Sequence, residues 1–222
     1  MHGELLKLGF HLSQPTVSRL ASTSAEEPRC GQALADVFTK SSPRHCGDGL
    51  LHGSHDHLGV LYCFFVISHE RRKILHFNVT RNPTTPWIVQ QMREAWPYAS
   101  THRFLFFDHD SKFGRDVVSA VRQLGSQPVR TAYRSPWQNG VAERWVGSCR
   151  RDLLDHLIVL NERHLKRLMA EYLRYYHEDH THLGLAKDTP AGRPIAISPP
   201  SGSTIRSFPR LGGLHHRYAL AA

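Results

Sequence analysis

The sequence has no long apolar run, no closely spaced pair of cysteines and fewer acids than bases, and each absence excludes a class of protein. No stretch approaches the roughly 20 apolar residues that span a bilayer, so we expect no membrane helix. The first ten residues carry Glu4 and Lys7 where a secretory signal would be apolar. The cysteines are Cys30, Cys46, Cys63 and Cys149. Without a CxxC pair they exclude a zinc knuckle and indicate free thiols in a reducing compartment.

The charge balance points to a polyanionic partner. Among 222 residues there are 28 Lys and Arg against 19 Asp and Glu, which gives a formal charge of +9 and a pI of about 9.7. Such a balance favours nucleic acid over a membrane surface, because no segment is apolar enough to insert. The length suits one core domain with an appendage.

Four segments differ in pattern. Residues 1–20 resemble a helix-turn-helix remnant, in which Gly9 ends a first helix and Ser13 caps a second that offers Arg19 to DNA. Any short helical hairpin would have the same pattern, so both interpretations stay open. Residues 21–57 show neither helical nor strand periodicity and predict an irregular linker. Residues 58–195 predict a core domain, and 196–222 a C-terminal tail.

Strands and helices alternate in the predicted core. An opening hairpin is followed by helix, strand, helix, strand and two long helices, a pattern typical of an α/β domain with a mixed sheet. The expected strands are 60–68, 74–80, 103–108 and 128–133, and the expected helices are 86–96, 116–125, one from about 139, and 161–176.

Two acidic residues lie at positions where catalytic or metal-binding side chains are expected. Asp108 follows an apolar strand, and Glu143 lies 35 positions later in the first turn of a helix rich in arginine. If they share a site, their carboxylates suit Mg²⁺ (or Mn²⁺), since hard cations prefer oxygen ligands. Each acid also has a simpler role: Glu143 can pair with Arg144 or Arg150, and Asp108 can be a helix N-terminal acid. Spacing alone leaves these alternatives open.

Four stretches resemble the integrase core of bacterial insertion-sequence transposases. They are "FFDHDSKFG", "RSPWQNGVAERWVGSCRRDLLDH", "NERHLKRLMAEYLRYYHEDHTHLGLAKDTPAGRP" and "FPRLGGLHHRY". The resemblance implies the DDE superfamily, a ribonuclease H-like fold and Mg²⁺-dependent strand transfer on DNA. It makes Asp108 the second acid of the triad and Glu143 the third. The resemblance also implies that the block "YYHEDHTHLGL" contacts DNA. The arginines around the two acids, Arg144, Arg150 and Arg151, would hold the DNA backbone, and we expect Asn139 to contact nucleic acid as well.

The first acid of the triad is missing. Relatives carry a first-strand motif like M-D-F-F-T-V-P-T, and its Asp falls on Gly49 of this chain. Asp48, one place away, is the alternative candidate. Read one nucleotide later, the possible codons from Asp48 to Leu58 permit that same motif. We therefore interpret residues from about 21 to 58 as a frame-shifted insert.

These observations predict a ribonuclease H-like transposase or integrase core that acts on DNA, without a complete triad. The alternative is a non-catalytic DNA-binding protein, and a helix-turn-helix repressor is a third possibility. We expect a homo-oligomer when active, no membrane association, and a cytoplasmic, nucleoid-associated location in bacteria.

Overall fold

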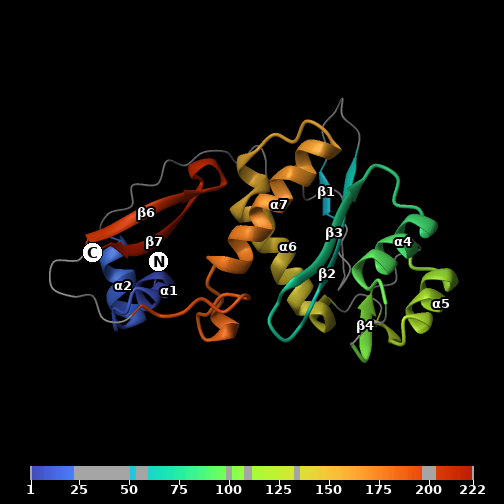
Figure 1. Cartoon of the computed structure of the whole chain (residues 1–222), viewed down its shortest axis with the longest axis horizontal. Helices are drawn as coiled ribbons and strands as arrows, with labels where there is room; N and C mark the ends of the chain where they lie inside the picture. Colours follow the sequence, from blue (N-terminus) through green and yellow to red (C-terminus); the bar gives the residue numbers. More distant parts are fainter. Residues whose placement is uncertain are drawn as a thin grey trace. The chain divides into compact units, whose positions relative to one another are not determined.

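The computed structural model describes residues 2–22, 51–53, 60–98, 102–107, 112–132, 136–196 and 204–221 (Figure 1). Asp48, Asp108 and most of the predicted linker therefore lie outside the described residues. The chain divides into two compact units. One holds the described residues up to 22 and from Ala170 onward, and the other holds those from Leu51 to Met169.

The sheet of the second unit starts from the predicted hairpin. The strands β2 (Leu61–Ile67) and β3 (Ile74–Thr80) pair antiparallel, which confirms the hairpin. β2 is buried along its whole length except at Tyr62, as its apolar run predicts. On its other side, β2 pairs with β1 (Leu51–Gly53). This strand is so short that it covers only residues 61–63 of β2.

A βαβ unit follows. The helix α4 (Thr85–Ala95) begins at Thr84, whose hydroxyl accepts a hydrogen bond from the backbone N–H of Trp87 at 3.4 Å. The parallel strands β4 (Phe104–Phe107) and β5 (Gln127–Arg130) are joined through the helix α5 (Arg115–Gln123). The expected helices and strands of this part are confirmed within a few residues.

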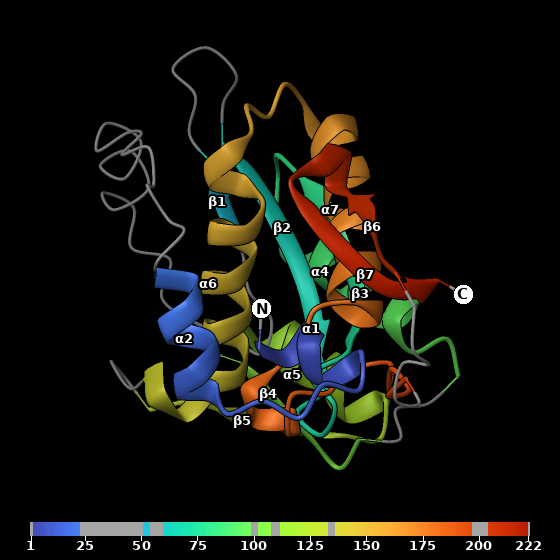
Figure 2. The same cartoon turned by 90° about the vertical axis from the view of Figure 1, so that its left-hand side faces the viewer.

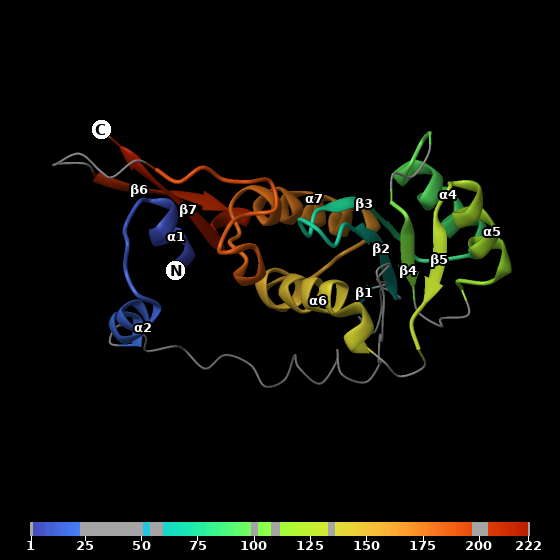
Figure 3. The same cartoon turned by 90° about the horizontal axis from the view of Figure 1, so that it is seen from below.

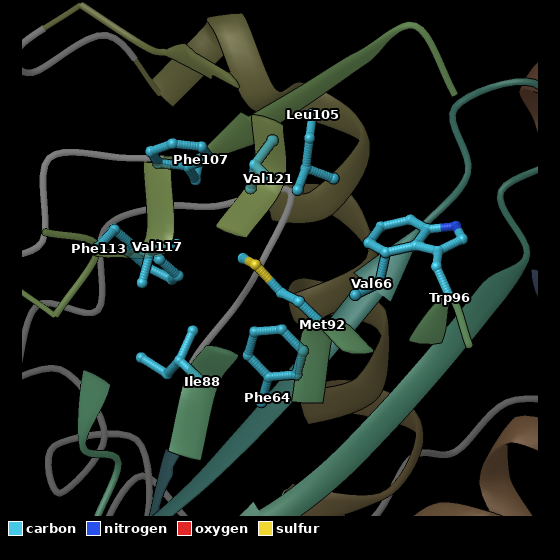
Figure 4. Packing of buried hydrophobic residues seen from close by; sticks show 10 residues of the cluster. All are labelled: Phe64, Val66, Ile88, Met92, Trp96, Leu105, Phe107, Phe113, Val117 and Val121. Atoms are coloured by element: carbon cyan, nitrogen blue, oxygen red, sulfur yellow. The ribbon is translucent and has the colours of Figure 1, made fainter. Parts of the chain in front are cut away.

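Apolar side chains from β2, α4, β4 and α5 form one core (Figure 4). It includes Phe64, Met92, Phe107 and Val121, all with 2% or less of their surface exposed. At roughly 1.5–3 kcal/mol for each fully buried side chain, this cluster is a principal source of the unit's stability.

The sheet is not continuous across the described residues. Hydrogen bonds form a three-stranded group β1–β2–β3 and a separate pair β4–β5, whereas the sequence predicts one mixed sheet. A cavity of about 210 Å³ lies between the ends of β2 and β4, with Ile67 and Phe104 among its lining residues. The three described residues of β1 pair only with residues 61–63 of β2, and no described strand links β2 to β4.

Two long helices complete this unit. The short 3₁₀ turn η1 (Pro136–Asn139) leads into α6 (Gly140–Asp152), which runs alongside β2 (Figure 2). After the turn η2 (Leu154–His156), the helix α7 (Glu162–Glu178) begins at Asn161. The Asn161 side chain accepts a hydrogen bond from the backbone N–H of His164 at 2.9 Å, which confirms the predicted cap.

The first unit combines both ends of the sequence. It contains α1 (His2–Lys7), α2 (Gln14–Ser22), the end of α7, the turns η3 (Leu183–Leu185) and η4 (Leu211–Gly213), and the hairpin β6 (Thr204–Arg210) with β7 (His215–Ala221). α1 lies beside β7 (Figure 3). Among the described residues, no helix combines the length and the apolar character needed to cross a bilayer.

Buried ion pairs hold α1 in this unit. The ammonium of Lys7 contacts Asp188 Oδ1 at 2.6 Å and donates to the carbonyl of Arg193. Arg193 pairs with Glu4 at 2.8 Å and donates to the carbonyl of Tyr218 at 2.7 Å. The two expected helices at residues 1–22 exist, but α1 is tied to the C-terminal segment. A DNA-binding helix-turn-helix and the predicted domain boundaries stay predictions.

Candidate functional site

The helix α6 is positioned by one apolar stripe. Ala142, Trp145, Cys149 and Leu153 recur at helical spacing and are each 1% exposed or less. The Trp145 ring packs against Phe65 of β2 with centroids 4.1 Å apart, and the Cys149 thiol lies 3.6 Å from the sulfur of Met169. This burial fixes the rotation of the helix, so the direction of every other side chain on it follows.

Glu143 lies in the first turn of α6, next to the buried stripe, and is half-buried. Within the described part of the chain, no hydrogen bond or ion pair involves its carboxylate. It does not pair with Arg144 or Arg150, which was its simpler predicted role. A half-buried carboxylate without a partner is of the right chemical kind to bind a hard cation.

Asp108 lies outside the described residues, but both strands that lead into the predicted site are described. Phe107 ends β4, and its carbonyl accepts a hydrogen bond from the backbone N–H of Thr131 at 3.1 Å, just beyond β5. The backbone N–H of Ala132 then donates to the side chain of Gln138 at 2.6 Å, in the turn before α6. The chain therefore leaves β4 toward Asp108 and leaves β5 toward Glu143 at the same end of these two parallel strands.

Lys112, the next described residue after Phe107, lies beside β2. The ammonium of Lys112 lies 5.6 Å from the ring centroid of Tyr62. Tyr62 is the partner of His52 in β1, and the described residues of β1 include no carboxylate. Asp48 lies outside the described residues, so its candidacy as the first acid is not tested.

The predicted nucleic-acid contacts on α6 differ in exposure. Arg144 and Arg151 are exposed, whereas Arg150 is half-buried and already interacts with another residue. A Cβ at Gly147 would lie 3.1 Å from Nη1 of Arg151, so the glycine gives this guanidinium room to lie along the helix. Arg19 is exposed on α2 in the other unit.

Asn139 is fully buried at the start of α6. Neither its side-chain oxygen nor its nitrogen has a hydrogen-bond partner among the described residues, and the same holds for Nε1 of Trp145. A buried amide without a partner costs about 1–3 kcal/mol. As placed, the Asn139 side chain does not reach solvent, so the predicted contact with nucleic acid stays a prediction.

The described residues contain no group of three or more His, Cys, Asp or Glu that could hold a metal ion. The buried thiols are poor metal ligands, because burial raises the pKa of Cys63 to about 12 and raises that of Cys149 well above its ordinary value. Glu143 is thus the one predicted metal ligand that the structure describes.

The block "YYHEDHTHLGL" has both buried and exposed residues. Tyr176, Asp179 and His182 are 2%, 1% and 7% exposed. Asp179 binds two arginines of the hairpin, with distances of 2.6 Å to Nε of Arg210 and 3.4 Å to Nη1 of Arg217. The sequence pattern did not single out Arg210 and Arg217 as partners of Asp179. The available signal was that no acid follows Asp188 in the sequence.

Comparison with known proteins gives sequence and fold relatives. A family model described as the integrase core domain matches residues 124–190, which include Glu143 and all of α6. The putative transposase InsD for insertion element IS2E of Escherichia coli (strain K12) is 35% identical over 70 residues, which are 32% of each chain. The transposase InsD for IS2A/D/F/H/I/K of Escherichia coli is also 35% identical over 70 residues, 23% of its length. The chain thus matches a third or less of these relatives.

The fold also has a solved counterpart. A chain of the cryo-EM structure of the simian T-cell lymphotropic virus intasome, in complex with the PP2A regulatory subunit B56 gamma, aligns with a TM-score of 0.52. The alignment covers 79% of this chain and 65% of that one at 12% identity, so it speaks to the fold alone. It agrees with the mixed α/β, ribonuclease H-like class.

Proposed function

Residues 124–190 carry an integrase core sequence related to DDE transposases, and from this premise we propose that the chain descends from an enzyme of DNA transposition. The ancestral reaction is strand transfer, in which a hydroxyl attacks a phosphodiester. The observation that carries the proposal is the family match across α6, with Glu143 in the first turn. The chain matches a third or less of these transposases, so strand transfer by the whole protein is part of the proposal.

Glu143 and Asp108 are the residues that would hold Mg²⁺ or Mn²⁺. The carboxylate of Glu143 is half-buried without a partner among the described residues. Asp108 follows β4 directly, and the chain toward Glu143 leaves the same edge beside Thr131. A bound metal would activate the attacking hydroxyl and stabilise the leaving oxygen. The role of the two side chains is to place that metal at the sheet edge.

We propose that the present chain does not catalyse strand transfer. The described part of β1 consists of Leu51, His52 and Gly53, none of which is an acid. With one negative ligand fewer, the site should bind Mg²⁺ poorly and lose the two-metal geometry. The frame-shift hypothesis accounts for the loss, because the shifted codons permit the motif that relatives carry.

Nicking of supercoiled plasmid DNA tests the proposal in three proteins. These are the present chain, a version with the shifted frame restored, and that version with Glu143→Gln. We expect Mg²⁺-dependent nicking only in the restored protein. Activity in the present chain that Asp48→Ala abolishes would show instead that Asp48 serves as the first acid.

A non-catalytic DNA-binding protein is the second candidate. It is favoured by the exposed Arg144 and Arg151, whose charges no described carboxylate of α6 neutralises. Such a protein binds DNA without Mg²⁺ and loses affinity steeply as salt rises. Persistent salt-dependent binding without nicking, in both the present and the restored chain, would favour this candidate.

We propose further that the protein works on the bacterial nucleoid as a homo-oligomer. The fold relative comes from an intasome, and DNA with two ends to be joined requires more than one core. Light scattering with and without DNA measures the mass of the particle. A monomer in both conditions would contradict this part of the proposal.

A further inference from the structure

The hairpin β6–β7 presents a row of arginines on one face. Neighbours along a strand alternate between faces, and directly paired residues share a face. Arg206, Phe208 and Arg210 therefore lie on one face of β6. Arg217 pairs with Phe208 and joins them. From Arg206 to Arg210 the row extends about 13 Å, at about 3.3 Å for each residue.

The row carries an uncompensated positive charge. Arg206, Arg210 and Arg217 contribute +3, and their one carboxylate partner, Asp179, contributes −1, so the net charge is 3 − 1 = +2. Within the described part of the chain, no ion pair involves Arg206, and its side chain is exposed. No acid occurs anywhere after Asp188. The remaining arginine of this region, Arg193, is neutralised by Glu4.

Asp179 holds the Arg210 guanidinium by a hydrogen bond and forms a looser ion pair with Arg217. It is 1% exposed at the end of α7, yet the side chains of Arg210 and Arg217 are 32% and 38% exposed. Each arginine has five N–H donors, of which the carboxylate uses a part. The Arg210 guanidinium is held by its hydrogen bond to Asp179 before any ligand arrives, whereas Arg217 is only close to the same carboxylate. Donors of both arginines beyond these contacts remain available to a ligand.

We infer that this row of arginines, Arg206, Arg210 and Arg217, binds the phosphate backbone of DNA. The ligand must be an anion with several charges, since the row offers guanidinium donors along about 13 Å. Duplex DNA carries a phosphate every 3.4 Å or so along each strand. Phe208 lies between the arginines and is 43% exposed, and such a side chain suits sugar edges or an unstacked base better than an acidic peptide.

The inference rests on the proposed function for its ligand but concerns a different surface. The proposed site lies on α6 and at the ends of β4 and β5, whereas the hairpin belongs to the other unit. The contact expected from the block "YYHEDHTHLGL" stays a separate prediction. Within that block Asp179 is buried and pairs with Arg210 of the hairpin.

The test measures binding of the full chain to a random-sequence duplex by fluorescence anisotropy between low and moderate salt. Each phosphate contact contributes about 0.9 to the slope of log K against log salt. We expect Arg206→Ala to lower the slope by about that amount and Arg206→Lys to restore it. Ser207→Ala, on the opposite face of β6, is the matched control and should leave the slope unchanged.

The outcomes separate the two proposals. If Arg206→Ala leaves the slope unchanged while Arg151→Ala lowers it, the hairpin inference is wrong and the α6 interface stands. If Arg206→Ala lowers the slope and the restored chain does not nick DNA, the hairpin inference stands without the catalytic proposal. A poly-glutamate peptide that displaces the duplex at equal charge concentration would assign the row to acidic polymers in general and overturn the inference.

Discussion

The indole ring of Trp145 packs on the phenyl ring of Phe65 with centroids 4.1 Å apart and planes tilted by 46°. Both side chains are almost completely buried. The contact joins α6 to β2 and so determines which way Glu143 points. An apolar contact in the core therefore positions the one metal-ligand candidate that the structure describes.

Removing that contact should destabilise the unit. We expect Trp145→Ala to lower the free energy of unfolding by about 3–5 kcal/mol, the usual cost of deleting a buried aromatic side chain. Urea denaturation followed by circular dichroism measures the change. Tyr98→Ala is the control, because Tyr98 is 98% exposed and its loss should change stability by less than about 0.5 kcal/mol. A similar loss in both variants would contradict the packing argument.

The arginines of α6 should differ in their effect on DNA affinity. We expect Arg151→Ala and Arg144→Ala each to reduce the salt slope by about 1, since both guanidinium groups are exposed. The double replacement of Arg150 and Arg151 should flatten the slope further. Binding isotherms at a series of salt concentrations provide the measurement. An unchanged slope in the double variant would remove both residues from the interface.

The thiols of Cys63 and Cys149 should resist alkylation in the folded protein. Burial raises the pKa of Cys63 from its ordinary value of 9.0 to about 12, and raises that of Cys149 as well. Since the reactive species is the thiolate, labelling by iodoacetamide at pH 8 should require unfolding. Mass spectrometry of the two peptides, with and without guanidinium, measures the protection.

The same rises in thiol pKa predict that the folded protein loses stability at high pH. The folded protein holds these thiol protons more tightly than the unfolded chain does. Their contribution to stability is therefore complete below pH 9 and is lost as the pH rises from there toward 12. A Cys63→Ala variant should lose less stability over that range than the unchanged chain. Equal losses would contradict this assignment.

The ion pairs around Lys7 should make the C-terminal segment depend on the first helix. Lys7 is 7% exposed, and replacing it with Met leaves Asp188 without its cation. We expect a loss of about 1–3 kcal/mol, because the hydrogen bonds of the ammonium to Asp188 and to the carbonyl of Arg193 are both removed. Amide exchange should accelerate in residues 188–196, whereas α5 in the other unit should keep its protection. Unchanged exchange near Asp188 would show that the pair does not hold the segment.

The sequence predicted elements whose signals are local. The cap at Asn161, the apolar run of β2 and the amphipathic stripe of α6 each specify one element through neighbouring residues. The hairpin β6–β7 was not predicted, because residues 204–209 are all exposed and no alternation of buried and exposed residues marks the strand. The contact between Lys7 and Asp188 joins residues 181 positions apart, and no local pattern encodes it. The pairing of Asp108 with Glu143 stays a prediction from the resemblance.

Restoring the shifted frame should stabilise the core as well as supply an acid. The described residues of β1 cover only residues 61–63 of β2, and an open pocket of about 210 Å³ is lined by the end of β2 and by β4. A first strand with the motif Met-Asp-Phe-Phe-Thr-Val-Pro-Thr is long enough to lie between them and bury its phenylalanines. We expect the free energy of unfolding to rise by a few kcal/mol, since each phenylalanine that becomes fully buried contributes roughly 1.5–3 kcal/mol.

The denaturant dependence should change in the same experiment. A continuous sheet buries more surface, so the m-value of urea unfolding should increase together with the midpoint. The control carries the same residues in shuffled order, which keeps composition and length but places charged and apolar groups on the wrong faces of the strand. If the shuffled version is stabilised as much as the restored one, the gain comes from composition alone. The first strand would then not be the missing element, and the frame-shift hypothesis would lose its structural support.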